Sequence, residues 1–497
     1  MMRIALLLVL FLAAAMSILW GAARAFDAAE EHRVTYRYIA AAHTPLPEAK
    51  SHVEWGPPSF MLVRPFTDAD AAAIGRALGE AWQLLAIAQE SGNADLIADR
   101  FTGVAETRAL RSVQDASTHG GRMVVLDQTA TPIFFHKDGS LFQAEVEMTV
   151  VRYLATDNHG LDAIEVTRDT GIATFLNETT GWRLMSWERR TSDALAASPA
   201  PFAGPVFGLN YYPSETPWRD FWPEFDVNDV ARDFDLVRTL NADSVRVFLT
   251  RDAFLGETSD ASLERLKQLL ALAEDKGLRV VPTLFDLKQD YGLGTWADDA
   301  LYLEHVLPVL RASPAVSFVD LKNEPDLDFD AHGTAKVTAW LETMISLTRA
   351  GATGLPLTIG WSSAEAAELL VDRLDVVTYH DYAPLDGTAT RLNAVRRIAG
   401  EKPVYITEIG DTSFGLAFGI PGSETTQADR LKARIEALSA ADGIMVWTLF
   451  DFPEVDPSVV GASPWVKRLQ SSFGVLRADG TEKPGAEVLR TLFAREN

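Results

Sequence analysis

Two glutamates at the ends of predicted β-strands offer the clearest chemistry in this sequence. One lies in Asp320-Leu321-Lys322-Asn323-Glu324-Pro325 and the other in Ile406-Thr407-Glu408-Ile409-Gly410. Pro325 cannot continue the hydrogen bonds of a strand and Gly410 permits a sharp turn, so each glutamate is expected where its strand leaves the sheet. Two opposed carboxyl groups in a cleft are what glycosidic bond cleavage requires. One protonates the leaving oxygen, and the other attacks the anomeric carbon or activates water.

The elements that must position these glutamates lie in residues 205–497, where strand-like segments alternate with helical patterns. One such pattern is Ala261–Lys276, which has leucines on one face and is followed by Gly277. The predicted strands are Val206–Tyr212, Asp243–Phe248, Leu278–Phe285, Ser317–Glu324, Pro356–Trp361, Asp375–Tyr382, Pro403–Gly410 and Ile444–Phe450. This alternation predicts an α/β domain, a (β/α)8 TIM barrel with its chemistry at the C-terminal ends of the strands. An open doubly wound sheet is the alternative, but no glycine-rich phosphate loop follows any of these strands.

In such a barrel the fourth and seventh strands lie across from each other, so the two glutamates would share one mouth. Carboxyl groups about 5–5.5 Å apart give a covalent intermediate and retention of configuration. We expect the ionised nucleophile to raise the pKa of its neighbour, which then keeps a proton to donate. A single strand-end glutamate is more often a solvated or salt-bridged carboxylate, and it is the pair on opposed strands that favours catalysis.

Residues 26–191 predict a smaller N-terminal α+β domain. Apolar residues recur at helical spacing within 67–117 (Ile74, Leu78, Trp82, Leu85). Antiparallel strands are predicted at 121–135, 139–154, 161–176 and 181–191, and in the second of them apolar residues alternate with polar ones. A segment rich in alanine, serine and proline at 192–204 predicts a linker to the barrel. The order of elements, closing on Gly181-Trp182-Arg183-Leu184, resembles the nuclear transport factor 2-like cone, a fold that serves enzymes, ligand pockets and assembly modules alike.

The barrel region resembles a retaining glycoside hydrolase of clan A, of the family 5 cellulase and mannanase type. Asn323-Glu324-Pro325 matches the acid/base motif of the clan, and Thr407-Glu408-Ile409-Gly410 matches its nucleophile motif. The resemblance implies that Glu324 is the acid/base and Glu408 the nucleophile. The sequence departs from family 5 at the end of the third strand, where Thr283-Leu284-Phe285-Asp286 stands in place of the usual histidine.

The same resemblance implies roles for several neighbouring side chains. Arg246 would lie beside the nucleophile and keep it charged, and Asn323 would bind the sugar 2-hydroxyl. In His380-Asp381-Tyr382, the tyrosine would donate to the nucleophile and the histidine would contact sugar hydroxyls or the acid. Trp447 would floor the reactive sugar, since an aromatic face suits the C–H face of a pyranose.

Further residues of the barrel are predicted from their positions. Asn210 is predicted as a supporting residue. Tyr379 competes with Tyr382 for the sixth-strand role, and because side chains alternate along a strand we favour Tyr382. Aromatics near the strand ends either stack on a chain of neutral sugars or anchor loops in the core. They are Tyr211, Tyr212, Trp218, Trp222, Tyr291, Trp296 and Trp361, of which Trp296 is predicted to contact substrate.

The N-terminal segment predicts export. Arg3 precedes an apolar run over 4–20, and Ala23-Arg24-Ala25 provides a cleavage motif, so residues 1–25 are expected to be a signal peptide. An uncleaved membrane anchor is the alternative, because the run is close to the length that spans a bilayer. The protein is therefore expected to be periplasmic or secreted.

The composition of the chain limits the classes of partner and cofactor that it is expected to bind. The chain of 497 residues carries 45 basic and 69 acidic side chains, a net charge of −24, which disfavours nucleic acid and anionic polymers. The absence of cysteine excludes disulfides, thiolate metal sites and cysteine nucleophiles. The histidines show no metal-binding spacing, and the acidic run Asp326–Asp330 lacks the glycine and terminal glutamate of a calcium loop. We therefore expect no cofactor and no metal.

The expected function is cleavage of a β-linked neutral poly- or oligosaccharide, most simply by an endo-acting enzyme. A transglycosylase that passes the glycosyl group to a sugar acceptor is one alternative. A non-catalytic polysaccharide-binding or assembly protein on a hydrolase scaffold is another. Intact Glu324, Glu408, Arg246 and Asn323 argue against the latter. The N-terminal domain either binds glycan, binds a secretion partner or only braces the barrel, and the sequence does not choose among these roles.

Overall fold

A computed structural model describes residues 53–155, 161–178, 181–195, 200, 204, 206–415, 422–461 and 463–494. The predicted signal peptide, its anchor alternative and residues 26–52 lie outside the described residues. Among the helices of the described ranges, none is both long and apolar enough to cross a bilayer.

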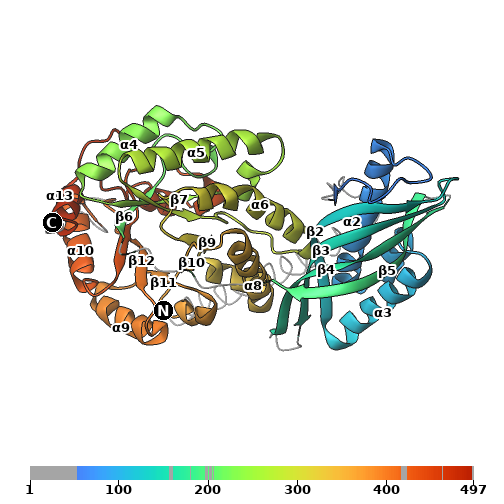
Figure 1. Ribbon diagram of the computed structural model, residues 1–497. Helices are drawn as coiled ribbons and strands as arrows, with labels where there is room; N and C mark the ends of the chain where they lie inside the picture. Colours follow the sequence, from blue (N-terminus) through green and yellow to red (C-terminus); the bar gives the residue numbers. More distant parts are fainter. Residues whose placement is uncertain are drawn as a thin grey trace, which may run out of the picture.

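Two domains lie side by side, a curved antiparallel sheet with two long helices and a closed parallel barrel (Figure 1). The predicted fold class is therefore confirmed. The sheet domain comes first in the chain, and its β2, β3 and β4 face the barrel helices α6 and α8 (Figure 1).

The N-terminal sheet has the strand order β1-β2-β3-β4-β5, with β1 parallel to β2 and the other neighbours antiparallel. Its strands are β1 Val53–Trp55, β2 Gly121–Phe135, β3 Leu141–Ala155, β4 Leu161–Glu178 and β5 Gly181–Ala194. The long helices are α2 Asp68–Ser91 and α3 Gly103–His119. Thr67 caps the start of α2 in a reciprocal capping box with Asp70, and Gly92 ends it in the left-handed conformation that glycine adopts without strain.

Both faces of the sheet are buried where it meets the barrel. Met148 and Val150 point to the helix side and share a core with α2 and α3, whereas Val151 and Tyr153 belong to the core of the barrel. The predicted alternation with one polar face therefore holds only for the first half of β3, because the second half lies between two cores. At the end of the domain, β5 continues through Ala194, paired with Thr167, so the first residues of the predicted linker are strand.

The barrel closes in the order β6-β7-β8-β9-β10-β11-β12-β13, with β13 pairing back onto β6 and all neighbours parallel. Its strands are β6 Phe207–Tyr211, β7 Ser244–Phe248, β8 Arg279–Thr283, β9 Val319–Asn323, β10 Leu357–Trp361, β11 Val377–His380, β12 Val404–Ile409 and β13 Gly443–Val446. Each matches a predicted strand within a few residues at its ends.

Helices surround the barrel. The α-helices are α4 Val227–Thr239, α5 Ser259–Asp275, α6 Trp296–Ala312, α7 Phe329–His332, α8 Thr334–Gly351, α9 Thr388–Ala399, α10 Glu424–Ala437, α11 Pro457–Val460, α12 Pro464–Gln470 and α13 Pro484–Leu492. The 3₁₀ helices are η1 Ala94–Asp99, η2 Trp218–Asp220, η3 Arg251–Phe254, η4 Gly256–Thr258, η5 Leu293–Thr295, η6 Pro325–Asp328, η7 Ala366–Glu368, η8 Val371–Arg373 and η9 Leu385–Gly387. Between β10 and β11 the chain forms only η7 and η8, so this crossover lacks the α-helix of an ideal barrel.

Candidate active site

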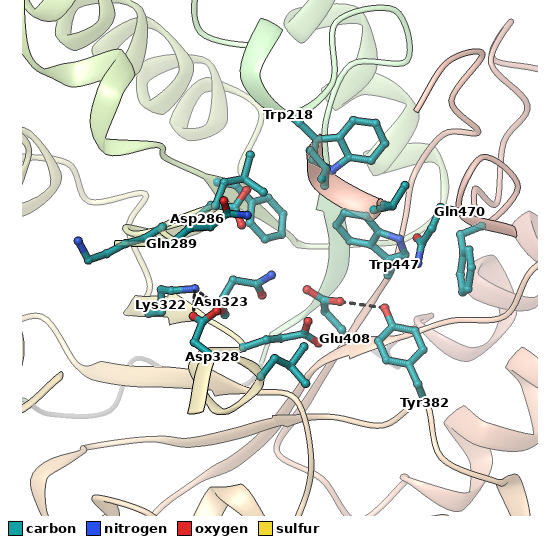
Figure 2. A pocket seen from close by; sticks show the side chains of 18 of the residues that line it. Trp218, Asp286, Gln289, Lys322, Asn323, Asp328, Tyr382, Glu408, Trp447 and Gln470 are labelled. Carbon is teal, nitrogen blue, oxygen red and sulfur yellow. Dashed lines mark hydrogen bonds and ion pairs between the residues drawn. The ribbon is translucent and has the colours of Figure 1, made fainter. Parts of the chain in front are cut away.

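A cavity of about 630 Å³ opens where the barrel strands end (Figure 2). Its residues come from η2, from the ends of β7, β8, β9, β11, β12 and β13 and from the segment 459–473. Those lining it are Trp218, Phe248, Asp286, Leu287, Lys288, Gln289, Lys322, Asn323, Glu324, Leu327, Asp328, Tyr382, Glu408, Trp447, Val459, Val460, Val466, Gln470 and Phe473. Glu324 and Glu408, predicted from strand-end motifs far apart in the chain, therefore share one cavity.

Glu408 is held from two sides. Its side chain is 7% exposed, and Arg246 Nη1 donates to its Oε1 at 2.5 Å. The Tyr382 hydroxyl donates to its Oε2 at 2.8 Å, a contact visible in Figure 2. Although the ring of Tyr382 is 40% exposed, burial of the hydroxyl and the negative charge of Glu408 raise the pKa of Tyr382 well above its ordinary value. Tyr382 therefore stays protonated and remains a donor to this carboxylate.

Arg246 on β7 is fully buried and uses its whole guanidinium group. Besides Glu408, it donates through Nε and Nη2 to Asp320 Oδ2 on β9, at 3.0 and 2.7 Å. Burial lowers the pKa of Arg246, but the charges of Asp320 and Glu408 outweigh it and raise the pKa overall. A permanent positive charge, fixed between two carboxylates, thus offsets the negative charge of Glu408 inside the protein.

Two asparagines complete the network around Arg246. Asn210 on β6 accepts from Arg246 Nη1 at 2.9 Å and donates through Nδ2 to the Thr407 carbonyl at 2.9 Å, so it ties the arginine to the strand of Glu408. Asn323 accepts from Arg246 Nη2 at 2.8 Å through its Oδ1. Because that oxygen is engaged, the amide nitrogen of Asn323 remains as a donor for a ligand in the cavity.

Glu324 sits on unusual backbone. Its φ of 47° is in the left-handed region, which costs a non-glycine residue roughly 1–2 kcal/mol. The conformation is held by the bond from the Glu324 N–H to the Gly360 carbonyl at 2.7 Å and by Pro325, which starts η6. Strained backbone persists where surrounding structure determines it, commonly at functional sites. Here it turns the chain out of β9 with the carboxyl group facing the cavity.

His380 is the direct partner of Glu324. Its side chain is fully buried, and its Nδ1 lies 2.7 Å from Glu324 Oε1 and 3.7 Å from Glu408 Oε2. Burial lowers the pKa of His380, but the charge of Glu408 and the bond to Glu324 raise it overall. Burial raises the pKa of Glu324, but the hydrogen bond and charge of His380 lower it overall.

This pair differs from the sequence prediction. The pKa of Glu324 was expected to be raised by the charge of Glu408, whereas the hydrogen bond and charge of His380 lower it. The bond between His380 Nδ1 and Glu324 Oε1 therefore joins two groups whose pKa values shift in opposite directions.

The two glutamates meet as a pair. One carboxylate oxygen of each, together with a ring nitrogen of His380, forms a group of atoms within 4.8 Å of one another. Such a trio could also hold a metal ion. Arg246 already supplies a positive charge at Glu408, and Glu324 is bonded to His380, so the trio fits proton transfer better than cation binding.

Trp447 follows β13 and forms one side of the cavity (Figure 2). The Trp447–Thr448 peptide bond is in the cis form. Its ring meets Phe248 and Tyr212 edge to face, with centroids 5.8 and 6.5 Å away. These contacts fix the indole where it lines the cavity. Trp447 therefore stands where a sugar-stacking residue is expected.

Trp296 is not part of this site, which corrects the expectation that it contacts substrate. It is fully buried at the start of α6, where Tyr153 of the N-terminal sheet stacks on it, with centroids 6.0 Å apart. Of the other strand-end aromatics considered as sugar contacts, only Trp218 lines the cavity. Tyr211, Tyr212, Trp222, Tyr291 and Trp361 are buried in the core. Tyr379 is buried too, so Tyr382 is the tyrosine of its segment that reaches the site.

Sequence reasoning missed several polar residues of the cavity. Asp286, just after β8, lines it and accepts from the Tyr212 hydroxyl at 2.7 Å. Lys322 lines the cavity as well, and Asp320 holds Arg246. They precede Glu324 by two and four residues, and this spacing in one strand end was the signal that could have revealed them. Gly360 shows no such signal, yet a Cβ there would meet Asp320, Arg246 and His380 at 2.8, 3.0 and 3.3 Å.

Comparison with known proteins gives a likeness of fold. No family model matches the sequence, and no curated protein matches it. A GH5_18 structure from Streptomyces cattleya in complex with GlcNAc is 22% identical, covering 59% of this chain and 80% of its own, with a TM-score of 0.47. An exo-beta-1,4-mannosidase from Opitutaceae bacterium strain TAV5 is 20% identical, covering 61% of this chain and 62% of its own, with a TM-score of 0.48.

A third similar structure, a GH2 beta-galacturonidase from Eisenbergiella tayi bound to galacturonate, is 14% identical. It covers 75% of this chain and 72% of its own, with a TM-score of 0.47. All three identities are below 25% and all three TM-scores are below 0.5. We therefore base the proposed function on the geometry of the site itself.

Proposed function

We propose that this protein is a retaining β-glycoside hydrolase that cleaves a β-linked neutral polysaccharide or oligosaccharide by double displacement. The observation that carries the proposal is a pair of carboxylates in one cavity with one oxygen of each within 4.8 Å of the other, one held by Arg246 and Tyr382 and the other by His380. Inverting enzymes separate their carboxyl groups by about 6.5–9.5 Å to admit a water, so this shorter separation favours a covalent intermediate.

In the first step, a Glu408 oxygen attacks the anomeric carbon as the bond from that carbon to the leaving oxygen breaks. Glu324 transfers its proton to the leaving oxygen, and the first product departs with it. The proton reaches Glu324 from the bond it shares with His380 Nδ1. Arg246 and Tyr382 hold the attacking carboxylate in place, which lowers the cost of orienting it.

In the second step, Glu324, now ionised, accepts a proton from a water molecule. The water oxygen attacks the anomeric carbon, and the ester to Glu408 breaks. The sugar leaves with the configuration it had at the start, and both carboxyl groups return to their initial states. The amide nitrogen of Asn323 donates to the sugar 2-hydroxyl, and Trp447 packs against the C–H face of the ring.

Two further features belong to the proposal. The apolar run over 4–20 and Ala23-Arg24-Ala25 support export, which would place the enzyme where polysaccharide is found. Two helices followed by four antiparallel strands support a nuclear transport factor 2-like assignment for the N-terminal domain.

The test is a screen of the purified protein against β-linked glucans, mannans and exopolysaccharides, with detection of new reducing ends. The active substrate is then followed by NMR, where the first product is expected to keep the β configuration. An added sugar acceptor separates hydrolysis from transglycosylation. Binding without turnover across the panel would contradict the proposal, and a first product of inverted configuration would overturn the double displacement.

A further inference from the structure

The N-terminal sheet and the barrel share one continuous apolar core. Val124, Val151 and Tyr153 of the sheet lie in the same cluster of buried side chains as Trp296 and Leu303 of α6. The helix α6 packs against β2, and α8 packs against β3 and β4. The helix α6 therefore joins the two domains, and its side chains also contact residues of the loop that leads to the cavity.

A first chain of contacts leads from the sheet into the loop that precedes α6. Tyr153 stacks on Trp296 with ring centroids 6.0 Å apart and an interplanar angle of 22°. The indole N–H of Trp296 donates to the Tyr291 carbonyl at 3.1 Å. Trp296 and Tyr291 are both fully buried. The sheet therefore holds the backbone of this loop through the buried side chain of Trp296.

The same chain continues into the cavity. The Tyr291 hydroxyl donates to Asp328 Oδ2 at 2.5 Å, and Lys322 Nζ lies 3.4 Å from that oxygen. Lys322 also donates to the Asn323 carbonyl at 2.7 Å. Lys322, Asn323 and Asp328 line the cavity directly beside Glu324 and face Glu408 and Trp447 across it (Figure 2).

A second connection starts one turn further along α6. Asp299 is fully buried, accepts from the Trp340 indole N–H at 2.8 Å and pairs with Lys288 Nζ at 2.7 Å. Lys288 lines the same side of the cavity. We call this side the polar wall, which comprises Asp286, Lys288, Gln289, Lys322, Asn323 and Asp328.

We propose that the N-terminal domain is a positioning element of the active site, which holds the polar wall in its substrate-binding arrangement through Tyr153, Trp296 and Tyr291. The expected effect on kinetics rests on the proposed function, whereas the expected effect on the structure of the polar wall does not. Tyr153 is not among the residues that line the cavity, and it stacks on Trp296 of α6. Substrate groups that bind the polar wall therefore depend on a domain that contributes none of the described residues lining the cavity.

The experiment compares Tyr153→Ala with Tyr153→Phe in the full chain. The alanine variant removes the stacked ring and should raise KM for an oligosaccharide about fivefold while kcat changes less than twofold. The phenylalanine variant keeps the ring and should behave as the wild type. Lys336→Ala on α8 is the matched control, since it removes an interdomain ion pair with Glu90 on α2 and leaves the stack of Tyr153 on Trp296 in place.

Hydrogen exchange measured by mass spectrometry gives a readout that needs no substrate. In Tyr153→Ala, peptides covering 286–296 and 322–332 should exchange faster than in Lys336→Ala, whose peptides should match the wild type. Tyr291→Phe, which removes only the hydroxyl that bonds Asp328, should reproduce the faster exchange at 322–332 and the rise in KM without unfolding.

The outcomes are distinguishable. Unchanged exchange in these peptides in both Tyr153→Ala and Tyr291→Phe would overturn the inference, whatever the enzyme hydrolyses. A wild type without glycosidase activity would instead refute the proposed function, and the exchange data would still decide whether the domain positions the wall. Equal effects from Lys336→Ala and Tyr153→Ala would show that the polar wall responds only to the general stability of the contact between the domains. That result would also overturn the inference.

Discussion

The surroundings of Glu408 and Glu324 differ in the kind of group that holds each carboxylate. Glu408 lies within β12, almost fully buried, with a permanent cation on one oxygen and a hydroxyl that stays protonated on the other. Glu324 lies just beyond the end of its strand on left-handed backbone, its side chain is 26% exposed, and the partner of its carboxylate is a histidine that titrates.

The difference matches two chemical tasks. A nucleophile must stay ionised and fixed, and groups that do not titrate near neutral pH secure both. An acid/base must gain and lose a proton in each cycle, and a partner that titrates makes this possible at moderate pH. Substitutions around the two carboxylates should therefore have different effects.

Removing the fixed carboxylate should abolish turnover. Glu408→Ala is expected to lower kcat by at least about 10⁴-fold, because no other group can form the glycosyl ester. Added azide should restore part of the rate and give the α-glycosyl azide, as a small anion occupies the vacated space. Glu264→Ala, on the exposed face of α5, is the control and should be neutral. Wild-type turnover by Glu408→Ala would contradict the assignment.

The cation beside Glu408 should be nearly as important, for stability as well as for rate. Arg246→Lys keeps the charge but loses the forked geometry that joins Glu408, Asp320 and Asn323. We expect kcat to fall about 10³-fold and the free energy of unfolding to fall by about 3 kcal/mol, since buried carboxylates lose partners. Kinetics and urea denaturation measure the two effects. A loss of stability without a loss of rate would show that Arg246 serves only the fold.

Neutralising the acid should produce a loss that depends on the leaving group. Glu324→Gln should slow hydrolysis of an oligosaccharide about 10³-fold, but should slow the first step on a 2,4-dinitrophenyl glycoside far less, because that leaving group needs no proton. Pre-steady-state kinetics on both substrates measures the ratio. Equal slowing of the first step on both would argue against an acid role for Glu324.

A single added methyl group beneath the site should disturb both carboxylates at once. The Cβ of Gly360→Ala would press on Asp320, Arg246 and His380, none of which has room to retreat. We expect about a tenfold loss of kcat and a destabilisation of about 1–3 kcal/mol. Gly485→Ala on α13 is the matched control, because its Cβ would make ordinary contacts of 3.6–3.9 Å. Full activity of Gly360→Ala would mean that the network is looser than these contacts imply.

The smallest expected effect is a shift in pH dependence. In the wild type, the pair of Glu324 and His380 keeps its proton until the pH passes the raised pKa of His380. The alkaline limb of kcat/KM should therefore lie above the ordinary pKa of histidine. In His380→Asn only Glu324 can carry the proton, so this limb should move to lower pH. An alkaline limb that does not move would show that His380 does not share the proton.

The barrel and its two glutamates were predictable because strand alternation and the motifs around Glu324 and Glu408 are local signals. The position of Trp296 was not, because its burial depends on Tyr153 in another domain. The same holds for Gly360, whose lack of a side chain matters only through Arg246 and His380 on other strands. The lowered pKa of Glu324 was missed because only the charge of Glu408 was weighed, although His380 was expected to contact sugar hydroxyls or the acid. The missing helix between β10 and β11 likewise reflects packing that local periodicity does not encode.

The most direct test of the central claim is to trap the glycosyl-enzyme. A 2,4-dinitrophenyl 2-deoxy-2-fluoro-β-glycoside of the sugar that the wild type hydrolyses slows the second step more than the first, so the intermediate should accumulate. Peptide mass spectrometry is expected to find the fluorosugar on the peptide that contains Glu408, with none on that peptide in Glu408→Ala. A label on Glu324 or on any other residue, or rapid turnover with an inverted first product and no label, would contradict the account.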